Sequence, residues 1–307
     1  MHAQILVLGS GPAGYTAALY AGLAGFRTIQ LMGILPGGQL IFTHEIENYP
    51  GCRSVSGMDL ADAFQAQVKQ AGVKMIYENA EQVDFRHRPF RVQTGLGTEI
   101  TADSVIIATG AMARWLQLPG EDQFIGHGVS VCATCDGFFF RGKPVAVIGG
   151  GNTAAYEALF LAKTCSKVYL IHTESRLSVE HNMLVKIQKS RKIVSVPNTQ
   201  AIAFTGEQKL TGVTIRNQKT GRQRELVVAG VFEAVGHIPN SHIFNGQLDI
   251  DSNGYILTQP LTLQTSVPGV FACGDIQSPR FRQAIIAAGD GCRAALAAKN
   301  YLLQIAD

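Results

Sequence analysis

Two stretches of the chain combine a short apolar strand, a glycine-rich turn and a helix, and this pattern restricts the fold more than any other feature. The first stretch carries Gly-x-Gly-x-x-Gly at positions 9–14, and the second carries Gly-x-Gly-x-x-Ala at 149–154. In such units the first glycine permits a tight turn, the second lets a pyrophosphate approach the backbone, and the third small residue lets the helix pack on the strand. The sequence therefore predicts an α/β chain with two separate dinucleotide sites.

Each unit continues with an apolar segment where the second strand of a nucleotide-binding fold belongs. Residues 28–32 follow the first turn, and residues 168–172 follow the second. The first of these strands does not end in the acid that usually contacts a ribose hydroxyl, so the first site matches the general fingerprint incompletely. A glycine turn without a ligand is the alternative interpretation of this motif.

A pair of cysteines, Cys132 and Cys135, lies between the two glycine motifs and is followed directly by Asp136. Positions i and i+3 share one face of a helical turn, so the two sulfurs can close a disulfide or open as a dithiol. Unpaired amides at a helix N-terminus stabilise a thiolate, and a neighbouring carboxyl can supply or remove the proton of thiol–disulfide exchange. We expect a redox centre in which Asp136 is the acid and base.

Three other interpretations of the cysteine pair stay open at this point. Half of a zinc site would need two more soft ligands at short spacing, whereas the other cysteines are scattered singly. A structural disulfide is unusual in a chain without an export signal, and two buried spectator cysteines are the third possibility. We expect no metal. Among the single cysteines we interpret Cys273 and Cys292 as small core residues and leave Cys52 and Cys165 unassigned.

The length of 307 residues is comfortable for two domains, each with a core of its own. The chain is 46% hydrophobic and 16% charged, which excludes disorder, and a net charge of +3 is too small to indicate a nucleic-acid partner. The N-terminal apolar run lacks a basic segment and is broken by glycines, so it is not a signal peptide, and no other run is long enough to span a bilayer. We expect a cytoplasmic protein with neither nucleic acid nor membrane as a partner.

The order of motifs along the whole chain resembles the low-molecular-weight bacterial thioredoxin reductases. The resemblance implies an α/β fold with two Rossmann-like domains of the three-layer ββα type, the second inserted into the first. It implies an FAD-binding domain of residues 1–111 and 241–307, and a pyridine-nucleotide domain of residues 112–240. Besides the two glycine turns and Cys-Ala-Thr-Cys-Asp-Gly at 132–137, it rests on Gly-Gly-Gln-Leu at 37–40, Ala-Thr-Gly at 108–110, Val-Gly-His-Ile-Pro-Asn at 235–240, Gly-Asp at 274–275 and Arg-Gln-Ala at 282–284.

The resemblance also implies a homodimeric enzyme that passes electrons from a reduced nicotinamide nucleotide through FAD and the Cys132–Cys135 disulfide to thioredoxin or a thioredoxin-like protein. Cys135 would be the flavin-proximal sulfur, and Cys132 would attack the partner's disulfide while Asp136 handles protons. One domain would rotate against the other between half-reactions, with hinges near 111–120 and 239–244.

The resemblance implies three sets of binding residues: one that docks the partner protein, one that binds FAD and one that binds the nicotinamide nucleotide. For the docking set there is an alternative interpretation, in which its aromatic residues simply belong to the hydrophobic core. The docking set is Arg114, Phe138 and Phe139. The FAD set is Gly9, Gly11, Pro12, Ala13, Gly14, Gly38, Gln39, Leu40, Asn48, Ala108, Thr109, Gly110, Gly274, Asp275, Arg282, Gln283 and Ala284. The nicotinamide nucleotide set is Gly149, Gly151, Asn152, Thr153, Glu157, His172, Glu174, Arg176 and Gly236.

One segment departs from the family pattern. Where the family has arginines that grip the 2′-phosphate of NADPH, this chain has Thr173, Glu174 and Ser178. An acid at the position of Glu174 would accept a hydrogen bond from a free ribose hydroxyl and repel a 2′-phosphate. We therefore expect NADH to be favoured over NADPH, or weak use of either nucleotide. Arg176 could instead pair with a phosphate, and the alternative for both residues is a solvated surface loop.

Other functions on the same scaffold stay open. Related flavoproteins include dithiol oxidases, which run cysteine-pair chemistry toward oxygen, and reductases fed by ferredoxin, which lack the nucleotide motifs. The intact glycine turn at 149–154 argues against both, because a domain that binds no dinucleotide does not need a close-approach glycine. A flavoprotein that senses redox state without turnover is the non-enzymatic alternative.

Overall fold

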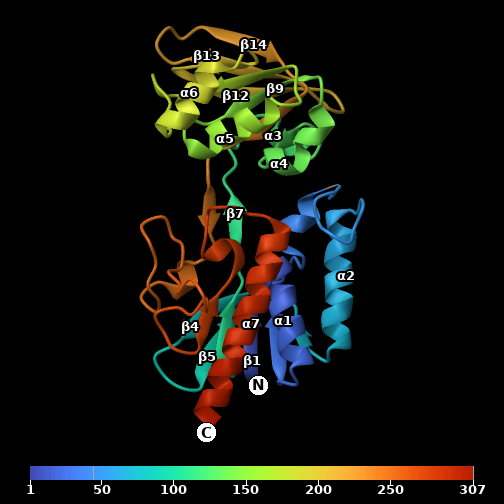
Figure 1. Cartoon of the computed structure of the whole chain (residues 1–307), viewed down its shortest axis with the longest axis vertical. Helices are drawn as coiled ribbons and strands as arrows, with labels where there is room; N and C mark the ends of the chain where they lie inside the picture. The colour runs from blue at the N-terminus through green and yellow to red at the C-terminus, as the bar shows by residue number, and fades with distance from the viewer. Residues whose placement is uncertain (44, 307) are drawn as a thin grey trace. The chain divides into compact units, whose positions relative to one another are not determined.

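The computed structural model describes residues 1–43 and 45–306, which fold into two compact units. The first unit comprises Met1–Met112 and His237–Asp307, and the second comprises Ala113–Gly236. The second unit is therefore an insertion in the sequence of the first (Figure 1).

The chain passes between the units twice, and the two crossing segments pair with each other. Strand β7 (Ala111–Ala113) and strand β16 (His237–Pro239) form a two-stranded ribbon. The second boundary falls earlier than the expected position 241, because Asn240 is bonded to the first unit. Its backbone N–H donates to the Gly110 carbonyl at 3.0 Å, and its side-chain Nδ2 donates to the Thr109 carbonyl at 2.8 Å.

A seven-stranded sheet forms the centre of the first unit. Its strands are β1 (His2–Leu8), β2 (Thr28–Leu31), β3 (Lys74–Ile76), β4 (Ala80–Asp84), β5 (Phe90–Thr94), β6 (Glu99–Ile107) and β17 (Val270–Ala272). They lie in the order β3-β2-β1-β6-β5-β4, and β17 also pairs with β6. Strands β1, β2, β3, β6 and β17 run parallel, whereas β4 and β5 form an antiparallel hairpin beside β6.

Within the described residues, the long helices of this unit are α1 (Pro12–Leu23), α2 (Gly57–Gln70) and α7 (Ala284–Ala306). Helix α1 packs along α7, as the blue and red ribbons of Figure 1 show. Alanines on both helices allow this close packing, and together with Val7, Ile106 and Phe271 of the sheet they form one hydrophobic core. A second core, which includes Phe85, Phe90 and Phe244, contains the buried strand residues that do not belong to the first core. Because α1 follows the first glycine turn directly, the sheet and helix position that turn.

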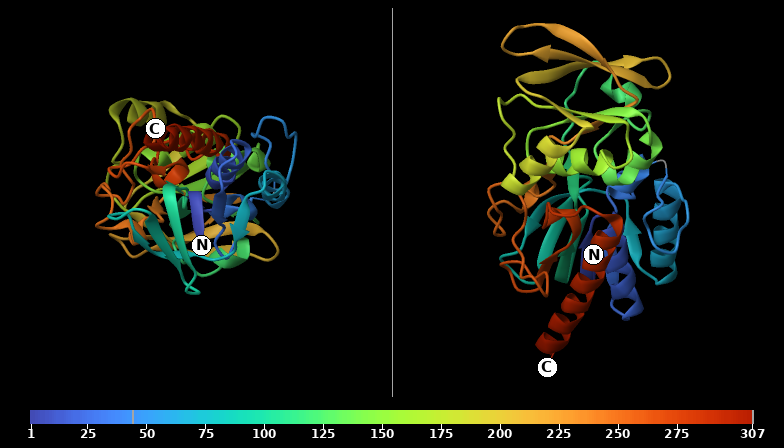
Figure 2. Two further views of the ribbon diagram at one scale, coloured as in Figure 1. Left: turned by 90° about the horizontal axis from the view of Figure 1, so that it is seen from below. Right: turned by 45° about the horizontal axis from the view of Figure 1, so that its top comes forward.

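The second unit has three layers of secondary structure. Its parallel sheet is β11 (Ile193–Val196), β10 (Lys167–Ile171), β9 (Pro144–Ile148), β15 (Gly230–Glu233) and β8 (Val129–Ser130), in that spatial order. An antiparallel sheet of β12 (Thr199–Gly206), β13 (Leu210–Asn217) and β14 (Gln223–Val227) is a separate layer (Figure 2). The helices are α3 (Glu121–Phe124), α4 (Ala133–Asp136), α5 (Asn152–Leu161) and α6 (His181–Lys189).

Two cores separate these layers. One joins the antiparallel sheet to the parallel sheet through residues such as Phe204, Val213 and Val231, and the other joins the parallel sheet to α5 and α6 through residues such as Val147, Ala158 and Ile187. The predicted fold class, two Rossmann-like α/β domains, is confirmed. Within the described residues, no helix combines the length and the apolar character that crossing a membrane requires.

Short 3-10 helices occupy several of the segments that carry predicted site residues. They are η1 (Gly38–Phe42), η2 (Gly137–Phe140), η3 (His242–Phe244) and η4 (Gly274–Ile276).

Of the two single cysteines that we expect in the core, one is buried and the other is not. Cys273 is fully buried, but Cys292 on α7 is only half-buried, because one side of that long helix faces outward.

Candidate active site

The cysteine pair lies at the start of helix α4. Cys132 is the N-cap residue of this helix, and its sulfur forms a disulfide with the sulfur of Cys135, with the two Cα atoms 5.3 Å apart. The Cys132 carbonyl accepts hydrogen bonds from the backbone N–H groups of Cys135, at 3.2 Å, and Asp136, at 3.1 Å. The local turn therefore holds the two sulfurs on one face, as the spacing predicts.

A serine that sequence reasoning missed completes this turn. Ser130 ends strand β8, and its Oγ donates to Oδ2 of Asp136 at 2.6 Å. The same Oγ accepts the backbone N–H of Cys132 at 3.1 Å, and the hydroxyl of Thr134 lies 3.4 Å from the Cys132 sulfur. The available signal was a hydroxyl residue two positions before the first cysteine.

In the first glycine turn, Gly9 and Gly14 are closely packed, whereas the space beside Gly11 is open. Gly9 has φ +112°, and a Cβ there would lie 2.3 Å from the Ala108 carbonyl oxygen. A Cβ on Gly14 would lie 2.2 Å from the Gly9 carbonyl oxygen, whereas a Cβ on Gly11 would meet no atom within 4 Å. The structure thus packs the turn tightly against its own unit and leaves room beside Gly11, where a pyrophosphate would approach the backbone.

Other members of the predicted FAD set lie near this turn or on the segment that leads into α7. A Cβ on Gly38 would be 3.0 Å from the Cα of Gly11, so the start of η1, which also carries Gln39 and Leu40, lies against the turn. Asn48 Nδ2 donates to Gln283 Oε1 at 3.3 Å, and α7 begins at the next residue, Ala284. Gln30 was missed by sequence reasoning: it is fully buried, and its Nε2 donates to the Gly9 carbonyl at 2.9 Å.

A cluster of polar groups that share Arg282 as a neighbour includes Asp275, in η4 of the same unit. Burial raises the pKa of the Asp275 carboxyl to about 6, and Arg282 opposes that rise. Arg282 Nη2 donates to the Tyr255 hydroxyl at 3.0 Å. Burial, with Arg282 as a second cause, lowers the pKa of His237 to about 4. Within the described residues, the buried Nε of Arg282 and Nδ1 of His237 have no hydrogen-bond partner. Such unpaired polar atoms fit a polar ligand such as FAD.

The second glycine turn has the same construction as the first. Gly149 has φ +147°, a Cβ there would lie 2.5 Å from the Ala234 carbonyl oxygen, and a Cβ on Gly151 would meet no atom within 4 Å. Two hydrogen bonds tie this turn to the segment after β10. The Ser178 N–H donates to the Gly150 carbonyl at 2.8 Å, and the Glu180 N–H donates to Asn152 Oδ1 at 2.9 Å.

The predicted nucleotide-selecting residues differ in their exposure. His172 is buried at 3% exposure, its Nε2 is 2.9 Å from the Ser195 hydroxyl, and burial lowers its pKa. Glu174 and Arg176 are exposed, and the Glu174 carbonyl accepts the Asn198 N–H at 3.1 Å. Glu157, on α5, is buried.

The predicted docking residues are on the surface. Phe138 is 55% exposed, Phe139 is 41% exposed, and their rings meet edge to face at a centroid distance of 6.0 Å. Arg114 is also exposed. The interpretation that these two phenylalanines are core is therefore wrong, whereas Phe140 does pack inward against Phe232.

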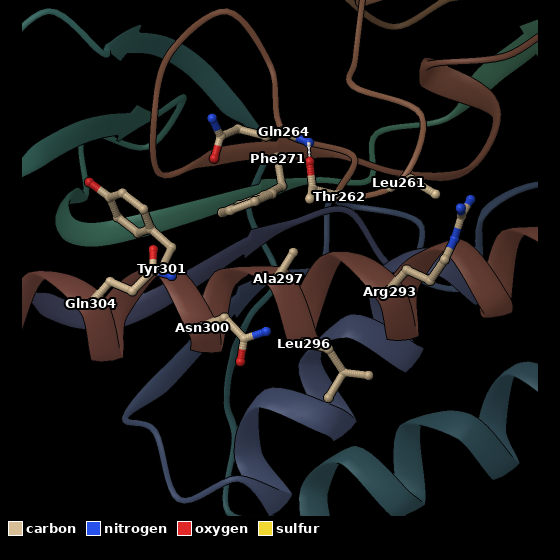
Figure 3. Close-up of a pocket in the computed structure, with 10 residues that line it drawn as sticks. All are labelled: Leu261, Thr262, Gln264, Phe271, Arg293, Leu296, Ala297, Asn300, Tyr301 and Gln304. Atoms are coloured by element: carbon tan, nitrogen blue, oxygen red, sulfur yellow. Dashed lines mark hydrogen bonds between the residues drawn. The ribbon is translucent and has the colours of Figure 1, made fainter.

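A cavity of about 420 Å³ lies elsewhere in the first unit, between α7 and the segment 261–264. Figure 3 shows Leu296, Asn300 and Tyr301 of α7 along one side of it and Thr262 and Gln264 on the other. None of its lining residues belongs to the predicted sites, so we assign it no part in the chemistry.

Comparisons with known proteins match this chain to one family over nearly its whole length. The family model described as pyridine nucleotide-disulphide oxidoreductase matches residues 3–291. A thioredoxin reductase of Rickettsia conorii is 43% identical over 97% of this chain and 98% of its own, and one of Escherichia coli O157:H7 is 45% identical over 100% and 98%. The solved thioredoxin reductase from Giardia duodenalis has a TM-score of 0.93 at 38% identity, covering 98% of this chain and 99% of its own.

The family model, with the fold and the two glycine turns, shows that the chain is a pyridine nucleotide-disulphide oxidoreductase, a class whose cofactors are FAD and a nicotinamide nucleotide. Within that class the chain belongs to the low-molecular-weight thioredoxin reductases. It is accordingly a flavin-dependent disulfide oxidoreductase.

Proposed function

We propose that the enzyme takes electrons from a reduced nicotinamide nucleotide, with NADH favoured, and delivers them through FAD and the Cys132–Cys135 disulfide to a thioredoxin-like protein. The observation that carries this proposal is the disulfide at the start of α4, in the same unit as the second glycine turn. Bound FAD would supply the two-electron chemistry that links a nicotinamide to a disulfide.

The residues of the chain would bind the flavin, carry the electron pair and transfer the proton. The glycine turn at 9–14 and the Asp275 cluster would hold FAD, the first by its open backbone and the second by unpaired polar atoms. Cys135 would receive the electron pair, and Cys132 would attack the partner's disulfide. Asp136, one residue after Cys135, would take and return the proton of that exchange.

The preference for NADH rests on the segment after β10. Glu174 is exposed there, and the hydrogen bond from the Ser178 N–H to the Gly150 carbonyl ties the segment to the glycine turn. A carboxylate in that place accepts a hydrogen bond from a ribose hydroxyl and repels a phosphate dianion. Arg176 is exposed as well and is the residue that would pair with a 2′-phosphate if NADPH were used.

Anaerobic stopped-flow reduction of the bound flavin by NADH and by NADPH tests the nucleotide preference. We expect faster bleaching by NADH, and we expect Glu174→Arg to shift the NADPH-to-NADH ratio toward NADPH by about tenfold, since a tenfold ratio needs only about 1.4 kcal/mol. Glu207→Arg is the matched control, because it makes the same charge change at another exposed position of the second unit, outside the predicted sites. A strong NADPH preference of the unmodified enzyme would remove the role given to Glu174.

Turnover of an oxidised thioredoxin with the better nucleotide tests the function itself. No turnover, with flavin reduction intact, would favour a redox sensor, and oxygen uptake driven by a dithiol would favour an oxidase. The intact turn at Gly149 and Gly151 disfavours a ferredoxin-fed enzyme, because that turn leaves open space which only a closely approaching ligand needs.

We further propose that Arg114, Phe138 and Phe139 dock the thioredoxin-like partner, since exposed aromatic and arginine side chains are typical of such contacts. We also propose a homodimer located in the cytoplasm. The unpaired state of the remaining cysteines, Cys52, Cys165, Cys273 and Cys292, fits a reducing compartment. Sedimentation velocity checks the dimer, which would have twice the chain mass.

A further inference from the structure

Ser130 connects the three parts of the redox turn. It is buried at 8% exposure at the end of β8, where the sheet register pairs it with Phe232 of β15. Its Oγ accepts the Cys132 N–H and donates to Asp136 Oδ2, while the Asp136 N–H donates back to the Cys132 carbonyl. These bonds form a closed ring that fixes the carboxylate of Asp136 relative to Cys132.

The bonding of Ser130 favours one protonation state of Asp136. A hydroxyl has one proton to donate, and the Cys132 N–H already uses one of its two lone pairs. The single proton of Ser130 is therefore available for a carboxylate oxygen. The 2.6 Å separation is in the range of hydrogen bonds from a hydroxyl to an ionised carboxylate. Such a bond stabilises the ionised carboxylate over the protonated acid.

We propose that Ser130 is a positioning residue for thiol–disulfide exchange, which orients Asp136 and keeps it ionised beside Cys132. This inference rests on the proposed function and deepens it. The hydrogen bonds of the Ser130 hydroxyl go to Asp136 Oδ2 and to the Cys132 N–H and not to a sulfur, so Ser130 acts through Asp136. The ring also explains why a buried serine hydroxyl lies at the end of β8, where an apolar residue would fill the same space.

The step that Asp136 serves conserves atoms and electrons. The thiol of reduced Cys132 gives its proton to Asp136 while its sulfur attacks one sulfur of the partner's disulfide. The partner's S–S bond breaks, and its leaving sulfur takes the bonding electron pair and then the proton from Asp136. The Cys135 thiol next loses its proton to solvent and attacks the Cys132 sulfur, which restores the Cys132–Cys135 disulfide and releases the second partner thiolate, which solvent protonates.

Titratable groups on the packed elements also have to be considered as the origin of any pH dependence. Helix α5, which packs on α4, carries the buried acid Glu157. Strand β15, which pairs with β8, carries the buried acid Glu233, whose carboxylate accepts the Leu116 N–H. The segment η2, which follows α4 directly, has no titratable side chain. On α4 itself, the thiols of reduced Cys132 and Cys135 titrate and contribute a limb of their own. Asp136→Asn is therefore needed to identify the part of the pH profile that belongs to Asp136.

The test measures the exchange half-reaction of the holoenzyme across pH. The enzyme is reduced anaerobically by one equivalent of nucleotide and mixed with an oxidised bacterial thioredoxin, and free thiols are alkylated at timed points. In the unmodified enzyme we expect the rate to rise with pH along two limbs, an upper one from the Cys132 and Cys135 thiols and a lower one that Asp136→Asn abolishes. Ser130→Ala should move the midpoint of that limb upward by about one pH unit, because one charge-assisted hydrogen bond is lost. Below the original midpoint, the rate should then fall about tenfold.

Matched variants separate positioning from simple structural support. Ser130→Thr retains the hydroxyl and should restore the midpoint. Ser104→Ala removes another buried serine hydroxyl, one that donates to the Gly269 carbonyl at 2.8 Å, and should leave the midpoint unchanged. In the Asp136→Asn background, Ser130→Ala should cause no further pH shift. Flavin reduction by nucleotide should be unaffected by Ser130→Ala.

Several results would overturn the inference. They are a Ser130→Ala profile lowered equally at every pH with its midpoint unmoved, a failure of Ser130→Thr to restore the midpoint, and a lower limb that survives Asp136→Asn. If the unmodified enzyme does not reduce thioredoxin at any pH, the proposed function fails instead. The same pH series with dithiobis(nitrobenzoate) as the disulfide then still tests Ser130 separately.

Discussion

Glu233, the last residue of β15, is 1% exposed and lies beside a second buried acid, Glu121, which is 3% exposed. Each carboxylate accepts a backbone N–H from the chain segment that follows β7: Glu233 from Leu116 at 3.0 Å, and Glu121 from Leu118 at 3.2 Å. Burial, followed by the neighbouring Glu121, raises the pKa of Glu233 to about 8. The pair thus holds the start of the second unit through a carboxyl that is protonated at neutral pH.

This raised pKa makes stability depend on pH. Between pH 4.5 and about 8 the folded chain keeps a proton on Glu233 that the unfolded chain releases. The free energy of unfolding should therefore fall as pH rises through this window, by at most about 1.4 kcal/mol per pH unit. Denaturant unfolding of the unmodified chain and of Glu233→Gln across the window checks this. The variant, which cannot ionise there, should lose this part of the slope, and equal slopes would contradict the assignment.

At the scale of elements, the glycine turns show how a strand and a helix are joined around a ligand. The start of α1 is packed so closely that a Cβ on Gly14 would lie 2.2 Å from the Gly9 carbonyl oxygen, yet beside Gly11 there is open space. The same motif therefore contains one glycine that serves the packing of the fold and another that serves the approach of a ligand.

Two substitutions in this turn should separate the two roles. Gly14→Ala should lower the free energy of unfolding of the flavin-free chain by roughly 1–3 kcal/mol, because the helix must move away from the turn. Gly11→Ala should leave the melting temperature of the flavin-free chain nearly unchanged but reduce the flavin bound per chain. Calorimetry and the ratio of flavin to protein absorbance measure these effects. An unchanged flavin content in Gly11→Ala would contradict the role given to the open side.

At the scale of the whole molecule, each unit has its own hydrophobic cores. The cores of the first unit contain Tyr15 and Phe271 on one side and Phe90 and Phe244 on the other, and the second unit has a separate pair of cores. The units are joined through the ribbon of β7 and β16. Each unit therefore has the apolar packing needed to unfold as a unit of its own.

Scanning calorimetry should accordingly show two unfolding transitions rather than one. Removing FAD should lower only the transition of the first unit, because a ligand stabilises the unit that binds it, by about 2.7 kcal/mol at a free concentration one hundred times its dissociation constant. Hydrogen exchange with mass spectrometry assigns each transition to its residues. A single transition that moves as a whole on flavin removal would show that the units unfold together.

Much of the fold and part of the site were predictable because their signals are local. The two glycine turns, the strands before them and the helix after each follow from residues within about thirty positions, and the redox pair follows from an i, i+3 spacing. The exposure of Phe138 and Phe139 was not decided by such patterns, since adjacent Phe140 is packed inward. The predicted core position of Cys292 was wrong for the same reason, because burial depends on what packs against α7.

The fold class, the two glycine turns and the proximity of Cys132 to Cys135 follow from the sequence alone, because close spacing along the chain brings those groups together in any such fold. Only the tertiary structure decided which distant groups meet. Arg282 reaches Tyr255, Gln30 reaches the carbonyl of Gly9, and Glu233 reaches Leu116. Even Ser130 and Asp136, six positions apart, meet only because β8 ends where α4 begins. The physical reason is that burial and hydrogen bonding depend on three-dimensional neighbours, which residue spacing does not specify.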